Sequence, residues 1–495
     1  MSLQRLAFLT TLAATSALFI ADDARACGGC FVPPTESTVV SGHRMALSLS
    51  MDRTVLWDQI EYQGNPEEFS WVLPVKPGAT LEVASPSFFE VLEAGTANAI
   101  GEPQQFCGGD DMGYYDDGGG FGCGSSDYAA LEAAGGGDYR EPPPPVTVVS
   151  QGTVGPYETV TLSADDPAAL NTWLDEHGYS VPADVQPIID DYVAEGFDFI
   201  ALRLIPGEQV SAMQPVRVTT PGSSFTLPLR MVAAGTGATT ALTLFVLGEG
   251  RYEAQNFGNG SIASEDLVWD FKTSSSNYSE LRSQFFADRP EGAWLTSYAL
   301  QGALFGSVMD NLTMGASNLT YQVGDTSYST LAEAYVQQAI ANGEDVNLSC
   351  VETLSWLGSG DYEVVADCKG LDCPPKSGAT VDASSLACGA ADDLAAGLVG
   401  MHTGSLWITR LDAELPRAAL AQDLVLEATD LQEEVQHRVV PFKTENECGG
   451  TTSVQGASLI QPRRRGLPGG LVPITLGALG VGWWLRRRKS ELELV

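Results

Sequence analysis

Cysteines supply the residues in this sequence whose spacing most clearly suggests chemistry. Cys27 and Cys30 form a C-x-x-C pair, a spacing found in redox dithiols, in half of a zinc site and in structural disulfides. A redox pair needs a helix N-terminus that lowers the pKa of the first thiol, but residues 31–34 read Phe-Val-Pro-Pro. A zinc site needs a second ligand pair, and no other C-x-x-C or H-x₃₋₅-H is present. We therefore favour a structural disulfide, with redox or metal binding as the alternatives.

The other cysteines also point to disulfides. Nine cysteines in an exported chain predict a disulfide framework. Cys107 and Cys123 bracket a glycine-rich segment and are expected to pair with each other. A second group has three possible pairings, between which the sequence does not choose: Cys350, Cys368, Cys373 and Cys388. Cys448 is then the odd residue.

Histidine is scarce, which limits catalytic and metal sites. The four histidines lie far apart, without an H-E-x-x-H motif: His43, His177, His402 and His437. His402 lies near Ser405, but no G-x-S-x-G surrounds that serine. Phosphate-binding glycine motifs and the EF-hand spacing are also missing from the sequence. We therefore predict no catalytic, cofactor-binding or metal-binding residues, and calcium is the only cofactor that the acidic composition suggests.

The first 26 residues have the pattern of a secretory signal peptide. Arg5 precedes an apolar run over residues 6–20, and small residues occupy the −3 and −1 positions before Cys27. Cleavage after Ala26 would leave Cys27 as the N-terminus. An uncleaved anchor is one alternative. Lipoprotein processing at the Cys27 thiol is another, although Ala24 stands where leucine is usual.

The other end of the chain predicts one membrane-spanning helix. Residues 466–485 contain no charge, and 20 helical residues span roughly 30 Å, the thickness of a hydrocarbon core. Trp483 and Trp484 suit an interfacial aromatic belt. A basic cluster follows, which would stay on the cytoplasmic side: Arg486, Arg487, Arg488 and Lys489. We expect a single-pass envelope protein with a periplasmic or extracellular ectodomain.

The ectodomain is strongly acidic. The terminal segments hold nine of the 26 Lys and Arg residues and four of the 63 Asp and Glu residues, so residues 27–462 carry a formal charge of −42. Such a surface repels phosphate backbones and anionic headgroups, which excludes nucleic acid as a partner. The one expected partner is the membrane, which the C-terminal helix would contact. The sequence does not identify a protein partner.

Periodicity predicts an α+β fold, mainly antiparallel β with a few packed helices. Strand-like runs occupy residues 38–50, 55–62 and 69–75 at hairpin spacing. After the glycine-rich insertion at about 107–145, further strands are expected at these ranges: 146–149, 158–162, 197–205, 215–220, 225–233, 239–247, 406–411 and 424–428. Helices are expected after a cap at Asp165 or Asp166 and at these ranges: 185–194, 278–286, 330–341 and 384–398. Tryptophans within apolar patterns are expected in the core: Trp57, Trp71, Trp173 and Trp294.

Several long strings resemble one family of exported bacterial proteins. They include CGGCF at 27–31, VLWDQIEYQGNPEEFSWVLPVKPG at 55–78, VGPYETVTLSADDPAALNTWLDEHGY at 154–179, DDYVAEGFDFIALRL at 190–204 and LPLRMVAAG at 227–235. Together they are similar to the domain of unknown function 2330 family, of myxobacterial type. The resemblance runs over most of residues 27–300. It implies the same export from the cytoplasm and the same fold, but it identifies no catalytic residues. We expect the ectodomain to continue over residues 301–445, followed by a tether at 446–465.

These patterns favour a non-enzymatic envelope protein with a binding or structural role. Two alternatives stay open: an envelope hydrolase or peptidase with a carboxylate- or serine-based site, and a calcium-dependent adhesin. A pocket where carboxylates, serine or histidine converge with perturbed pKa values would favour the enzyme.

Overall fold

A computed structural model shows how most of the ectodomain is built. The structure describes residues 30–31, 39–63, 70–104, 146–177, 185–205, 213–233, 238–304, 321–323, 326–328, 357–365, 380–382 and 392–445. No helix among these residues is long and apolar enough to cross a membrane. The expected signal peptide, the span at 466–485 and all cysteines except Cys30 lie outside them. Only the backbone of Cys30 is described, in strand β1, so the disulfide predictions stay predictions.

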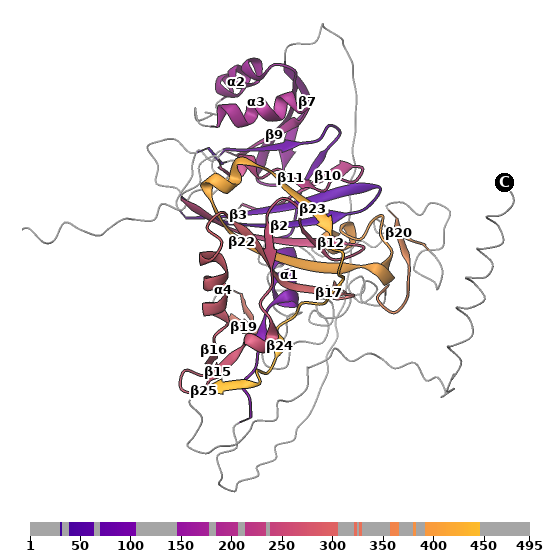
Figure 1. Ribbon diagram of the computed structural model, residues 1–495. Helices are drawn as coiled ribbons and strands as arrows, with labels where there is room; N and C mark the ends of the chain where they lie inside the picture. Colours follow the sequence, from indigo (N-terminus) through magenta and orange to yellow (C-terminus); the bar gives the residue numbers. More distant parts are fainter. Residues whose placement is uncertain are drawn as a thin grey trace, which may run out of the picture. The chain divides into compact units, whose positions relative to one another are not determined.

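An eight-stranded mixed sheet forms the centre of the fold (Figure 1). Its strands, in spatial order, are β14 (Gly258–Gly260), β17 (Ala293–Gln301), β22 (Trp407–Pro416), β12 (Thr239–Gly248), β2 (Val39–Leu49), β3 (Arg53–Gln63), β10 (Val216–Pro221) and β5 (Thr80–Val83). β12 pairs parallel with β2 and antiparallel with β22. Because β22 lies between β17 and β12, the part of the chain that follows residue 300 contributes a central strand to this sheet.

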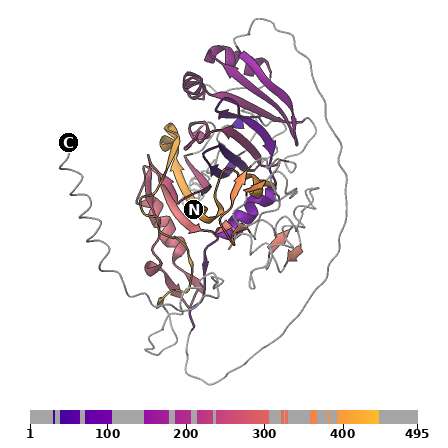
Figure 2. The ribbon, with the colours of Figure 1, turned by 90° about the vertical axis from the view of Figure 1, so that its right-hand side faces the viewer.

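A second, antiparallel sheet carries two helices on one face (Figure 2). Its order is β1 (Cys30–Phe31), β4 (Ser70–Val75), β9 (Asp198–Leu204), β8 (Tyr157–Ala164) and β7 (Val146–Val154). Helices α2 (Pro167–Glu176) and α3 (Gln186–Ala194) bury Leu170, Leu174 and Ile189 against one face of this sheet. The other face packs on β3 and β10 of the large sheet through Trp71 and Ile200.

Both faces of the large sheet are covered. Helices α1 (Pro86–Thr96) and α8 (Asp392–Ala396) pack Phe88, Phe89 and Leu394 against Trp57 and other residues of one face. The opposite face is covered by η2 (Arg230–Ala233), η7 (Arg417–Ala421) and their flanking residues. Burying this apolar surface is the main favourable contribution to folding.

The remaining elements surround these two sheets. They are β6 (Ala99–Ile100), β11 (Thr226–Leu227), β13 (Tyr252–Ala254), η3 (Ser264–Asp266), β15 (Val268–Asp270), β16 (Ser275–Ser276), α4 (Tyr278–Ala287), β18 (Tyr321–Val323), β19 (Thr326–Tyr328), β20 (Glu363–Val365), β21 (Thr380–Asp382), η6 (Thr403–Ser405), β23 (Leu424–Ala428), β24 (Arg438–Val439) and β25 (Lys443–Glu445).

The α+β fold class is confirmed, whereas several local expectations need correction. The β2–β3 hairpin forms as expected, but β4 joins the second sheet beside β9 instead of pairing with β3. Residues 225–233 form the short strand β11 and the 3₁₀ helix η2 rather than one long strand. Helix α1 and strand β17 were not expected. The helix expected at 330–341 lies outside the described residues, and within 384–398 the structure describes α8.

Candidate functional site

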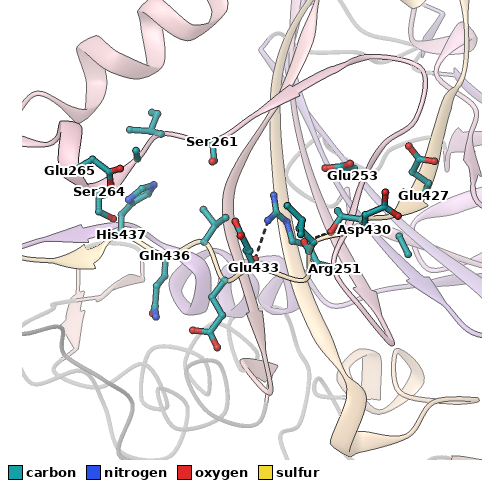
Figure 3. A pocket seen from close by; sticks show the side chains of 17 residues that line it. Arg251, Glu253, Ser261, Ser264, Glu265, Glu427, Asp430, Glu433, Gln436 and His437 are labelled. Carbon is teal, nitrogen blue, oxygen red and sulfur yellow. Dashed lines mark hydrogen bonds between the residues drawn. The ribbon is translucent and has the colours of Figure 1, made fainter. Parts of the chain in front are cut away.

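Three chain segments line an open pocket of about 750 Å³ at one side of the large sheet. We call it the acidic pocket; its lining consists of residues 251, 253, 261–265, 427–431 and 433–437. Figure 3 shows Glu253, Glu427 and Asp430 at one end, and Glu265 and the His437 ring at the other. This size lies within the range of small-molecule sites.

Hydrogen bonds to the turn between β12 and β13 fix one wall of the acidic pocket. Gly250 in this turn has φ +147°, a backbone conformation that favours glycine. The Arg251 backbone N donates to Gln432 Oε1 at 2.6 Å, and Thr429 N donates to the Arg251 carbonyl at 2.9 Å. Gln432 Nε2 in turn donates to the Thr429 carbonyl at 2.8 Å. The chain after β23 is thereby tied to β13.

The wall that carries His437 is held by the edge of the large sheet. Val435 forms an isolated antiparallel bridge with Ala299 of β17, with N···O distances of 2.7 and 2.8 Å. The His437 carbonyl accepts from Ala99 N at 2.9 Å, just before β24 pairs with β6. These backbone contacts fix the position of His437 independently of its side chain.

Negative charge dominates the acidic pocket. Its six carboxylates are those of Glu253, Glu265, Glu427, Asp430, Glu433 and Glu434. Arg251 is the one cation in the lining, so the pocket has a formal charge of −5 with His437 neutral. The Arg251 guanidinium donates to the Glu433 backbone carbonyl at 3.0 Å. Within the described part of the chain, none of the six carboxylates forms an ion pair.

Two of these carboxylates are directly opposed. Glu253 of β13 and Glu427 of β23 are register partners in an antiparallel pair. Like charges at such positions destabilise a sheet. A local conflict of this kind is expected where a ligand compensates for it.

His437 is the most unusual polar residue of the acidic pocket. It is 2 % exposed, and neither ring nitrogen has a hydrogen-bond partner among the residues that the structure describes. Burial lowers the pKa of the His437 imidazole below its ordinary value. Its ring lies 5.3 Å, centroid to centroid, from that of Tyr278. At neutral pH the His437 imidazole is therefore neutral, and both of its ring nitrogens are shielded from solvent.

The acidic pocket contains the residue types expected of a hydrolase site but not the expected hydrogen bond between them. Carboxylates, two serines and a histidine with a perturbed pKa converge in it. However, a serine nucleophile needs a base within hydrogen-bond reach, and His437 is hydrogen-bonded to neither Ser261 nor Ser264 in the structure.

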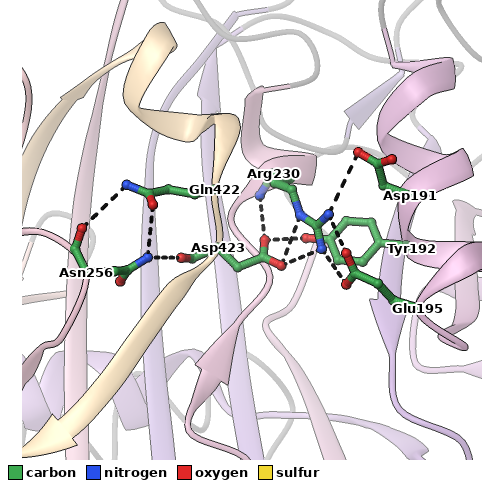
Figure 4. A network of polar contacts seen from close by, with 7 residues as sticks. All are labelled: Asp191, Tyr192, Glu195, Arg230, Asn256, Gln422 and Asp423. Carbon is green, nitrogen blue, oxygen red and sulfur yellow. Dashed lines mark hydrogen bonds and ion pairs between the residues drawn. The ribbon is translucent and has the colours of Figure 1, made fainter.

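A second polar cluster connects the two layers of the fold (Figure 4). Tyr192 of α3 donates its hydroxyl proton to Asp423 at 2.5 Å, and Arg230 Nη2 donates to the same carboxylate at 2.8 Å. Glu195 accepts from the exposed side of this guanidinium at 2.6 and 2.8 Å. The one guanidinium is in ion-pair range of three carboxylates, those of Asp191, Glu195 and Asp423. Asn256 and Gln422 extend the cluster toward β13. It fastens α3 to η2 and to the residue that precedes β23.

A family model described as "Uncharacterized protein conserved in bacteria (DUF2330)" matches residues 21–301, more than half of the chain. This chain belongs to the DUF2330 family. No curated protein and no solved structure matches it. The DUF2330 region supplies the acidic-pocket wall at 251–265, whereas the wall at 427–437 comes from chain beyond the match.

The other histidines of this DUF2330 chain do not form sites of this kind. His43 Nδ1 lies 3.3 Å from Asp58 Oδ1, but both residues are buried in the core. His402 and Asp361 are 3.6 Å apart on the exposed surface. His177 is the C-cap residue of α2, with Nδ1 2.7 Å from the Trp173 carbonyl oxygen. Among the described residues there is no group of three or more His, Cys, Asp and Glu arranged to hold a metal.

The sequence reasoning missed the acidic pocket altogether. Its one local signal is the density of acids in the segment 427–437, which ends at His437. This acidic segment does not stand out in the sequence, because Asp and Glu are abundant along the whole chain.

Proposed function

We propose that this protein is a non-enzymatic binding protein of the bacterial cell envelope that captures a positively charged ligand in its acidic pocket. The signal-peptide pattern before Cys27 and the uncharged stretch at 466–485 support this location, with an exported ectodomain held at a membrane by a C-terminal helix. The charge of the ectodomain would raise the local concentration of cations.

One observation carries this proposal. Six carboxylates and one arginine line the acidic pocket, and two of the carboxylates, Glu253 and Glu427, are opposed across paired strands. An ordinary solvating surface disperses its acids, whereas here they line a concave site and lack ion pairs within the described part of the chain. A bound cation would offset the repulsion and make charge-assisted hydrogen bonds.

The test compares two variants that remove the same charge. Glu253→Gln/Glu427→Gln neutralises the opposed pair, and Asp175→Asn/Glu176→Gln neutralises two exposed acids at the end of α2. Binding is measured by calorimetric titration of the detergent-solubilised full-length protein with spermidine, a pentalysine peptide and calcium chloride. A salt concentration of about 0.15 M screens weak attraction between the ligand and surface charges. We expect the first variant to lower the affinity for at least one cation by about tenfold or more. The matched control should stay close to wild type.

Equal affinity in the two variants would refute a cation site in the acidic pocket, as would the absence of binding to all three cations. The hydrolase alternative predicts covalent labelling of Ser261 or Ser264 by a fluorophosphonate probe. The proposal predicts that neither serine is labelled. The adhesin alternative predicts that calcium alone binds and raises the melting temperature.

A further inference from the structure

Four chain segments come together at one end of the large sheet. β2 and β12 are parallel neighbours and end together, with Leu49 opposite Gly248, so the turns that follow them lie close to each other. A hydrogen bond from Gly222 N to the Asp52 carbonyl at 2.8 Å ties the segment after β10 to the β2–β3 turn. The segment after β23 is tied to the β12–β13 turn in the same way. We call this surface the loop end; it consists of residues 50–53, 222–225, 249–252 and 429–433.

The loop end exposes large apolar side chains. Met51, Phe225 and Leu431 are 82 %, 41 % and 67 % exposed. They are three of the six large hydrophobic side chains that are exposed among the described residues, and the other three lie elsewhere, on β7 and just before β25. The Phe225 ring stacks on that of Tyr252, with centroids 6.1 Å apart. Single exposed apolar residues are common, but a group of large ones in neighbouring turns is typical of a contact site.

Negative charge surrounds these apolar side chains. The loop end holds the two cations Arg53 and Arg251 and four carboxylates, those of Asp52, Glu249, Asp430 and Glu433, so its formal charge is −2. Leu431, Asp430 and Glu433 also line the acidic pocket, which makes the two surfaces continuous. A second copy of this acidic ectodomain, or an anionic membrane, would be repelled here. The complementary occupant has apolar side chains and positive charge.

We propose that the loop end binds a basic amphipathic helix of a partner protein. Its apolar face would contact Met51, Phe225 and Leu431, and its Lys and Arg side chains would reach the surrounding carboxylates and the acidic pocket. This inference rests on the proposed function and makes the positively charged ligand a protein segment. Turns present side chains and no free sheet edge, so a helix suits this surface better than an added strand. Apolar contact supplies affinity, and opposite charge orients the partner.

The test compares serine substitutions of exposed apolar residues at two places. Met51→Ser/Leu431→Ser changes the two most exposed apolar residues of the loop end, and Val149→Ser/Phe442→Ser changes two that lie elsewhere. All four side chains are mainly in solvent and uncharged, so both variants should keep the charge and the melting temperature of the wild type.

Two lysine–leucine peptides of equal length, composition and charge serve as probes. In the first, leucines recur at i, i+3, i+4 and i+7 and form one face of a helix; in the second, the order is scrambled. Binding to the full-length protein in nanodiscs of zwitterionic lipid is measured by fluorescence anisotropy in about 0.15 M salt, with empty nanodiscs as the blank. We expect wild type to prefer the amphipathic peptide by about tenfold or more.

The variants should then separate apolar contact from charge. We expect Met51→Ser/Leu431→Ser to bind the amphipathic peptide about five- to tenfold more weakly, and the control variant to stay within about twofold of wild type. Spermidine has no apolar face, so its affinity should be the same in all three proteins.

Several results would overturn the inference and leave the proposed function standing. Equal affinity of wild type for the two peptides is one, and unchanged peptide binding in Met51→Ser/Leu431→Ser is another, provided that spermidine binding still depends on Glu253 and Glu427. Self-association of the wild type that this variant abolishes would identify a second copy as the occupant. Attachment of the wild type, but not of this variant, to added anionic vesicles would identify a lipid surface.

Discussion

The hydroxyl of Tyr192 offers a quantitative test of how α3 is held against η2 and the start of β23. The Tyr192 ring is fully buried, and its hydroxyl donates to Asp423 at 2.5 Å. The Arg230 guanidinium lies 4.1 Å from the ring centroid. Tyr192→Phe keeps the ring and this cation–π contact but removes a hydrogen bond to a carboxylate. Such bonds contribute about 1.5–3 kcal/mol, so we expect a loss of about 2 kcal/mol in the free energy of unfolding.

Asp423→Ala should cost more, because it leaves two partners unsatisfied. Arg230 donates to this carboxylate from its backbone N, Nε and Nη2 at 3.0, 3.1 and 2.8 Å. Breaking a buried pair costs about 3–5 kcal/mol. The lower end of that range applies here, since Glu195 still binds the guanidinium from its exposed side.

A double-mutant cycle on the full-length protein, measured by urea unfolding with tryptophan fluorescence, tests this reasoning. Once Asp423 is gone, the Tyr192 hydroxyl has lost its acceptor, so Tyr192→Phe should then cost almost nothing. The coupling energy should be about 1.5–3 kcal/mol. Equal costs of Tyr192→Phe in both backgrounds would show that the hydrogen bond does not hold α3. Glu195→Gln serves as a control of below about 1 kcal/mol, because its side chain is 46 % exposed.

Two further predictions concern the second sheet and the maturation of the chain. Gly155, in the turn between β7 and β8, has φ +53°, and a Cβ there would overlap Val83 Cγ1. Gly155→Ala should therefore lower the unfolding free energy by about 2–4 kcal/mol, whereas Gly152→Ala, with open space around it, should change it by at most about 0.5 kcal/mol. Mass spectrometry of the mature protein under non-reducing conditions should find Cys27 at the N-terminus and disulfide-linked cysteines; a retained Met1 with free thiols would contradict export.

The sequence predicted those helices that begin or end at recognisable capping residues. Asp166 and Pro167 mark the start of α2, and the Asp166 carboxylate accepts from Ala168 N at 3.0 Å as a helix cap should. Helix α1 was missed for a related reason. Its run PSFFEVLEAGT has no acidic residue in its first turn and no basic residue in its last. A short apolar run without such signals can be a strand or a helix, and only its packing decides between them.

Strand pairing was harder to predict than the strands themselves. β4 has the composition of a hairpin partner for β3, yet it joins the second sheet. Both of its faces are buried there, with Val72 packed toward α2 and α3 and Trp71 toward the large sheet. The tryptophans expected in the core are buried at Trp57, Trp71 and Trp294, whereas Trp173 is partly exposed and stacks on the ring of His177.

The sequence by itself determined the α+β class, most of the longer strands, the cap of α2, the family resemblance and the acidity of the ectodomain, because each of these depends on composition or on neighbours within a few residues. Only the tertiary structure decided that Glu253 lies opposite Glu427, and that His437 alone among four histidines is buried without a partner beside a cavity. Those facts come from pairing between segments far apart in the chain. With 63 acids available, no local pattern indicates which of them the fold will bring together.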